Sequence, residues 1–227
     1  MERRPHGYTL VLLLVVASTV FQLATSGSNV ARFVVVALQA VTLVAAVRTA
    51  RVRRAGARLA ALVAAVSVGV ALVVWAAHGD LPEATASLVN GLLVGVAPAV
   101  LAASLVRDLR ERHAVALNTL AGVLAIYLLA GMFFSFLYGV IDAVDTDALF
   151  AGIAGSTRSE QLYFSFVTLS TVGYGDFVPV TPLPRALAVG EMLLGQIYLV
   201  TIVSLIVANL GRGREGAVTP ASPAPDG

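Results

Sequence analysis

Six long apolar segments limit what this chain can fold into more than any other feature of its sequence. A helix needs about 20 mostly apolar residues to cross a bilayer, and six segments meet that condition, at roughly 8–25, 30–47, 58–77, 84–106, 114–141 and 185–210. Charged residues make up only 12% of the chain, whereas a soluble domain carries about 25%. We therefore expect an all-α membrane protein with six transmembrane helices in the lipid bilayer.

The arginines predict how these helices are oriented. All 15 basic residues are Arg, and Arg-rich loops stay in the cytoplasm. Most of them precede the first segment, follow the sixth, or lie between segments two and three or four and five, which share one side. Acidic residues gather on the other side. We expect both termini to be cytoplasmic and the membrane to be the cell membrane; the Ala- and Arg-rich composition without Lys is typical of GC-rich bacteria.

A shorter apolar stretch, 159–171, lies between the fifth and sixth segments and is too short to span. Non-helical backbone at membrane depth is tolerated only where protein buries it or it lines a water-filled path. The preceding Thr157-Arg158-Ser159-Glu160 matches the capping box that begins a helix. These features predict a short re-entrant helix followed by an extended return loop.

The return loop contains the most informative motif of the chain. Its sequence is Thr171-Val172-Gly173-Tyr174-Gly175-Asp176. It resembles the selectivity filter of potassium channels, in which the backbone carbonyls of a TVGYG loop replace the hydration shell of K⁺. The filter residues implied by this resemblance, and thus the K⁺ ligands, are Thr171, Val172, Gly173, Tyr174 and Gly175, with Asp176 at the outer end.

The residue types in this loop suit that chemistry. Gly173 and Gly175 permit the positive φ angles that aim successive carbonyls at one axis. Val172 and Tyr174 then turn their side chains away from the axis, and the Thr171 hydroxyl can add a ligand. A ring of carbonyls needs four such loops and the chain has one, so we expect a homotetramer.

Aromatic residues of the short helix are candidates for filter support. Tyr163, Phe164 and Phe166 are placed where they could brace Tyr174, although they could equally serve only to pack. The C-terminal end of this helix carries a partial negative charge. That charge would favour a cation in the cavity below the filter.

The resemblance extends beyond the filter, because residues 114–210 are similar to the pore module of the tetrameric potassium channel superfamily. The stretch 183–200 looks like the inner helices of bacterial members. The resemblance implies that Gly195 is the inner-helix hinge and that the cavity or gate is lined by Leu199, Val203 and Val207.

One departure concerns the filter's acidic residue. Val167 stands where some bacterial members place an acidic residue that bonds to the filter Asp. The corresponding bond to Asp176 must therefore be absent or come from another residue, for which Tyr163 is a candidate.

Residues 1–106 form a four-helix region of unknown role, 107–113 a cytoplasmic linker, and 211–227 a disordered cytoplasmic tail. A voltage sensor carries Arg on its fourth helix, yet 84–106 contains neither Arg nor Lys. Arg48, Arg51 and Arg54 have sensor-like spacing, but their loop position is explained by orientation alone. We expect little intrinsic voltage dependence, and any regulatory domain would belong to a separate subunit.

Glu191 is an ionisable residue inside the sixth segment, which makes it a functional candidate by default. It could instead reach the membrane interface, or support the pore loop from behind, which we favour.

The sequence as a whole predicts passive, selective K⁺ conduction. Two rivals remain open: a weakly selective cation channel, and a K⁺ uptake subunit of the type with four pore loops per chain. A membrane sensor with an inactive pore would pass no ions. No catalytic set, cofactor or nucleic-acid partner is indicated; K⁺ is the permeant ion.

Overall fold

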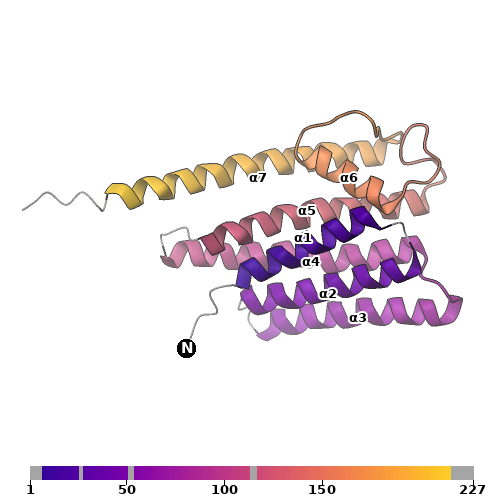
Figure 1. Cartoon of the computed structure of the whole chain (residues 1–227), viewed down its shortest axis with the longest axis horizontal. Coiled ribbons are helices and arrows are strands. Elements are labelled where there is room, and N and C mark those ends of the chain that lie inside the picture. The colour runs from indigo at the N-terminus through magenta and orange to yellow at the C-terminus, as the bar shows by residue number, and fades with distance from the viewer. Residues whose placement is uncertain (1–6, 26–27, 51–53, 113–116, 216–227) are drawn as a thin grey trace, which may run out of the picture.

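The computed structural model describes residues 7–25, 28–50, 54–112 and 117–215 (Figure 1). These ranges fold into seven α-helices: α1 (Gly7–Ala24), α2 (Asn29–Ala50), α3 (Arg54–His78), α4 (Glu83–Arg112), α5 (Leu117–Val144), α6 (Arg158–Leu169) and α7 (Pro182–Glu215).

Six of these helices are long and apolar enough to cross a membrane, all except α6. They coincide with the six segments expected from the sequence, and the protein is a multi-pass membrane protein. α4 continues to Arg112, so most of the expected linker is helical. α7 continues to Glu215, so the first residues of the expected tail are helical as well, while 216–227 lie outside the described residues.

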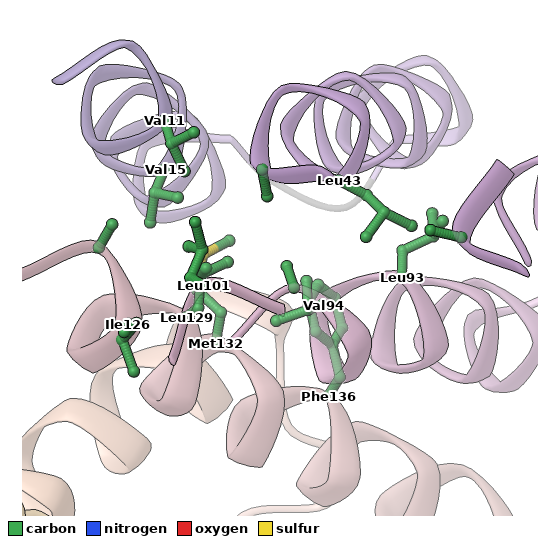
Figure 2. Packing of buried hydrophobic residues seen from close by; sticks show 14 of the residues in the cluster. Val11, Val15, Leu43, Leu93, Val94, Leu101, Ile126, Leu129, Met132 and Phe136 are labelled. Atoms are coloured by element: carbon green, nitrogen blue, oxygen red, sulfur yellow. The ribbon is translucent and has the colours of Figure 1, made fainter. Parts of the chain in front are cut away.

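The first four helices pack directly on the fifth. α4 lies against α2, α3 and α5, while α1 lies against α2, α5 and α6. Figure 1 shows α1, α2, α4 and α5 running side by side, with α3 at the edge. Figure 2 shows their shared core, which includes Val15 of α1, Leu43 of α2, Leu93 of α4 and Leu129 of α5. The N-terminal region and the outer helix α5 therefore share one apolar core.

α7 is the least covered of the six long helices. Among the described helices it packs only on α5 and α6, and it lies on the side of α5 away from α2 and α3 (Figure 1). Large apolar side chains along its membrane-spanning part are exposed in the single chain, among them Val189, Leu193, Ile197 and Val200.

Candidate functional site

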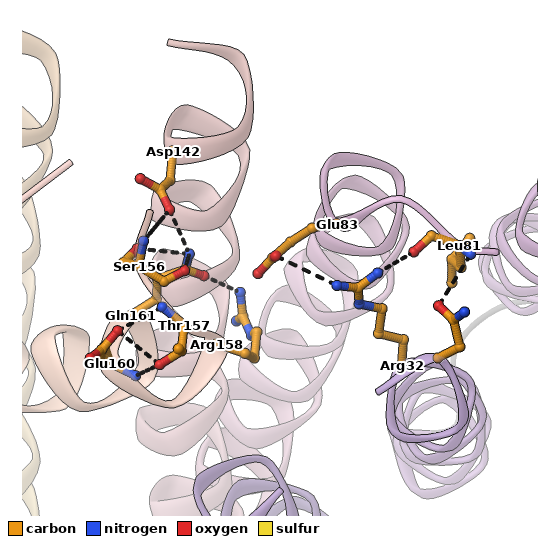
Figure 3. Close-up of polar contacts among 10 residues, drawn as sticks. Arg32, Leu81, Glu83, Asp142, Ser156, Thr157, Arg158, Glu160 and Gln161 are labelled. Carbon is orange, nitrogen blue, oxygen red and sulfur yellow. Dashed lines mark hydrogen bonds and ion pairs between the residues drawn. The ribbon is translucent and has the colours of Figure 1, made fainter. Parts of the chain in front are cut away.

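The short helix α6 begins with the capping box expected from its sequence. The Thr157 amide donates to the Glu160 carboxylate at 2.7 Å, and the Glu160 amide donates to the Thr157 hydroxyl at 3.4 Å. Figure 3 shows that Asp142 of α5 adds a second restraint, since it accepts from the amide and the hydroxyl of Ser156, both at 2.8 Å. The start of α6 is therefore tied to the outer end of α5.

The loop that follows α6 has an alternating backbone. Thr171, Gly173 and Gly175 have φ angles of 60°, 54° and 79°, whereas Val172 and Tyr174 between them do not have positive φ. The positive φ angles expected at the two glycines are confirmed. Nothing lies within 4 Å of where a Cβ would stand on either glycine. Glycine is therefore favoured at both positions by the backbone conformation and not by a lack of space.

Positive φ at Thr171 was not anticipated. A β-branched residue in this region is a true outlier, and such strain is concentrated at functional sites. The end of α6 holds the residue in place: the Thr171 amide donates to the Thr168 carbonyl at 2.9 Å, and the Val172 amide to the Val167 carbonyl at 3.0 Å. The loop thus starts from a strained position directly after the helix.

Asp176, at the far end of the loop, is bonded to the short helix. The Tyr163 hydroxyl donates to its Oδ2 at 2.8 Å, and this bond takes the place of one from an acidic residue at position 167. The hydrogen bond, followed by burial, raises the pKa of Tyr163, so the hydroxyl keeps its proton at neutral pH. The Val167 side chain lies in a groove with Val172 and Tyr174.

The aromatic side chains divide into two groups. Tyr163 and Phe166 line the groove that also contains Tyr174. Phe164 has a different environment, because its ring lies 5.0 Å from that of Tyr138 and 4.9 Å from that of Phe150. The expected bracing of Tyr174 by Phe164 is therefore not the contact that the structure shows. Phe164 instead helps to pack the outer loops.

Glu191 of α7 lies behind α6 and is fully buried. Its carboxylate accepts hydrogen bonds from the Tyr138 hydroxyl at 2.7 Å and from the Ser165 hydroxyl. These bonds join α5, α6 and α7. Sequence reasoning missed Tyr138 and Ser165, although polar groups inside lipid-embedded helices commonly find partners on other helices.

Gly195 lies one turn after Glu191, where α7 meets the end of α6. A Cβ on Gly195 would stand 2.0 Å from the Leu169 carbonyl oxygen, so close packing accounts for glycine here. α7 is continuous through this position, and the hinge stays a prediction. Leu199 is exposed in the single chain; the side chains of Val203 and Val207 lie outside the described part of the structure.

Comparisons with known proteins agree with this geometry. Residues 122–212 match a protein family described as an ion channel. A two-pore potassium channel 4 of Arabidopsis thaliana is 33% identical over 69 residues, which are 30% of this chain and 24% of that protein. The inward rectifier potassium channel Kirbac3.1 of Paramagnetospirillum magnetotacticum is 35% identical over 60 residues, or 26% and 20% of the two chains.

A probable potassium channel protein 2 of Methanocaldococcus jannaschii is 39% identical over 62 residues, which are 27% of this chain and 18% of that protein. The matched stretches therefore span about a quarter or less of these relatives.

The family match shows that residues 122–212, which include the loop, are similar to ion channels. The relatives narrow this class, because the matched stretches are similar to potassium channels.

Proposed function

We propose that four copies of this chain form a K⁺-selective channel that conducts passively across the cell membrane. The observation that carries the proposal is the alternating backbone of the loop, with positive φ at Thr171, Gly173 and Gly175. Alternation turns successive carbonyls toward the same side of the loop. K⁺ can then exchange its water shell for a set of carbonyl oxygens without meeting a fixed charge.

Apolar surfaces that are exposed in the single chain support the proposed tetramer. The side chains of Val172 and Tyr174 are 53% and 71% exposed, and they border a groove of about 350 Å³ between the loop, α6 and α1. The exposed apolar face of α7 is a second such surface. Neighbouring copies around one axis would cover both surfaces and place four loops in a ring.

The surrounding side chains would keep that ring at the correct width. Tyr163 holds Asp176 at the outer end of the loop, and Glu191 with Ser165 holds α6 against α7 from behind. The partial negative charge at the end of α6 would favour a cation below the filter. Leu199, Val203 and Val207 would line the wider path further in.

The proposal includes little voltage dependence, because 84–106 of α4 contains no Arg or Lys. It also includes cytoplasmic termini, and K⁺ as permeant ion rather than as a cofactor.

The test is the reversal potential of the purified protein in a planar bilayer, with K⁺ on one side and Na⁺ on the other. A value near the K⁺ equilibrium potential is expected. A robust current that reverses near zero would favour the weakly selective rival, and absence of any current would favour an inactive pore. A conductance that rises steeply with depolarisation over about 100 mV would contradict the voltage independence.

A further inference from the structure

Arg158, in the first turn of α6, directs its guanidinium into the protein and not toward the capping box (Figure 3). Nη1 donates to the Ser135 carbonyl of α5 and to Gln161, both at 3.0 Å, and Nη2 donates to the Ser135 hydroxyl at 2.6 Å. Nε donates to Gln22 of α1 at 3.4 Å. The guanidinium also lies 3.7 Å from the centre of the Phe136 ring, a favourable cation–π contact.

The bond to Gln22 continues into the N-terminal helices. The Gln22 amide donates to the Ser18 hydroxyl at 3.2 Å, and Gln39 of α2 donates to the same hydroxyl at 2.9 Å. The exposed fractions of all three side chains are 2% or less. Helices in lipid use such polar groups to bind one another. A buried polar path therefore runs from α2 through α1 to α6.

α4 approaches the same place across Gly139 of α5. A Cβ on Gly139 would stand 2.6 Å from Gln161 Oε1, 2.7 Å from Ser87 Oγ and 2.9 Å from Arg158 Nη1. These atoms come from α6 and α4. Because Gly139 has no side chain, the polar groups of these two helices can lie close together on the surface of α5.

A small cavity of about 40 Å³ lies beside Arg158, and its lining includes the polar side chains of Glu83 and Asn90 of α4. In Figure 3, Glu83 lies between Arg158 and Arg32, and its ion pair is with Arg32, at 3.6 Å. The buried Asn90 Oδ1 accepts no hydrogen bond from the described residues, and a cavity of this size with polar groups in its wall has room for water. The contact is polar and borders a small cavity, and Phe136, which lies against the Arg158 guanidinium, connects it to the apolar core of Figure 2.

We propose that Arg158 is a positioning residue through which the first four helices hold the pore helix α6, and thereby set how often the filter conducts. The contact at one end of α6 matters at the other, because the filter amides of Thr171 and Val172 bond to carbonyls of the last turns of α6. α6 is one continuous helix of 12 residues, so a shift of its first turn would be transmitted to its last turn. The inference rests on the proposed function and assigns a role to a region that has no motif of its own.

The test compares variants of the full chain in planar bilayers with K⁺ on both sides. Gln22→Leu removes the link on the α1 side and leaves every other bond of Arg158 in place. Gln22→Glu restores an acceptor at the same position. Arg158→Gln removes the guanidinium. Leu13→Ala, at a side chain of α1 that is 61% exposed in the single chain, is the matched control.

We expect Gln22→Leu to change the open probability at least threefold and Arg158→Gln at least tenfold, with an unaltered reversal potential. Gln22→Glu and Leu13→Ala should behave like the parent chain, and Gln22→Leu should add nothing to Arg158→Gln. Amide hydrogen exchange across α6 supplies a readout that needs no current. In the Gln22→Leu single variant this exchange should be at least threefold faster than in the parent chain.

The inference is overturned if Gln22→Leu matches Leu13→Ala in both open probability and exchange, or if the two substitutions act additively. A change in thermal unfolding that accounts for the whole effect would also overturn it, since that outcome indicates a merely structural contact. If Arg158→Gln does not fold, Gln22→Leu and its rescue by Gln22→Glu decide alone. A parent chain that conducts no K⁺ counts against the proposed function, while the exchange experiment still decides this inference.

Discussion

The pore region and the four N-terminal helices are held together in different ways. Where α7 meets the end of α6, helix approaches backbone: a Cβ on Gly195 of α7 would stand 2.0 Å from the Leu169 carbonyl oxygen. Where the N-terminal helices meet α5, helix approaches a side chain: the atoms nearest to a Cβ on Gly95 of α4 belong to the ring of Phe133, at 3.0 Å. A ring can turn aside at little cost, whereas a carbonyl at the end of a helix cannot.

This difference explains why one region has a recognisable sequence and the other does not. Backbone that must adopt one conformation permits few residue types, as at Gly173 and Gly175. Apolar side chains in a helical core can be exchanged for others of similar volume at small cost. The N-terminal helices therefore carry the composition of membrane spans without a motif.

The largest effect should come from a methyl group on the filter backbone. Gly173→Ala forces a non-glycine residue into a left-handed conformation, which costs about 1–2 kcal/mol in each subunit. The ring of four loops multiplies this cost, so we expect loss of K⁺-selective current. Single-channel recording with K⁺ on one side of the bilayer and Na⁺ on the other would measure this loss of selective current.

Gly69→Ala is the matched control for that experiment. Gly69 is a helical residue of α3 without positive φ, and nothing lies within 4 Å of where a methyl group on it would stand. Its substitution should therefore leave selectivity intact. Selective current through Gly173→Ala would contradict the requirement for left-handed backbone and, with it, the contrast between the two regions.

The sequence was sufficient for those parts of the site where local chemistry decides the structure. Hydropathy located all six long helices, the pattern at Thr157 and Glu160 located the start of α6, and the glycines located the positive φ angles. Each of these depends on residues close together in the chain. The fold class and the backbone conformation of the two loop glycines were therefore predictable from the sequence alone.

Contacts between distant segments were not predictable in the same way. Nothing near Ser165 or Tyr138 in the sequence indicates that both donate to Glu191, and Phe164 was assigned to the wrong neighbour because its direction depends on how α6 sits on α5. The strain at Thr171 is a further example. It arises from the junction of helix and loop, and β-branched residues ordinarily avoid positive φ.

Gly195→Ala should have a smaller but clear effect. The methyl group would push α7 from the end of α6, and such overpacking typically costs about 1–3 kcal/mol. We expect a lower thermal unfolding midpoint of the detergent-solubilised protein and a reduced current. Gly95→Ala is the comparison in the N-terminal region and should shift the midpoint much less. Equal shifts would mean that the two regions are packed alike.

Removal of one hydroxyl at the pore entrance should have the smallest effect. Tyr163→Phe removes the 2.8 Å bond to Asp176 but keeps the ring, whose centroid lies 5.7 Å from that of Phe177. Asp176 is exposed and Tyr163 is half-buried in the single chain, so water can replace part of the lost bond and its contribution is modest. We therefore expect the dwell time of the conducting state to shorten by about two- to tenfold.

The contrast between the regions is sharpened by Thr9→Val, which also removes one hydroxyl bond, from α1 to Asn118 of α5 at 3.3 Å. That bond is remote from the filter, so the dwell times of Thr9→Val should stay as in the parent chain. By contrast, Asp176→Asn combined with Tyr163→Phe should shorten the dwell time no more than the more severe of the two single substitutions. If Thr9→Val shortened the dwell time as much as Tyr163→Phe, the effect would reflect general loosening of the helices. The bond between α6 and the outer end of the filter would then have no special part in keeping the filter conductive.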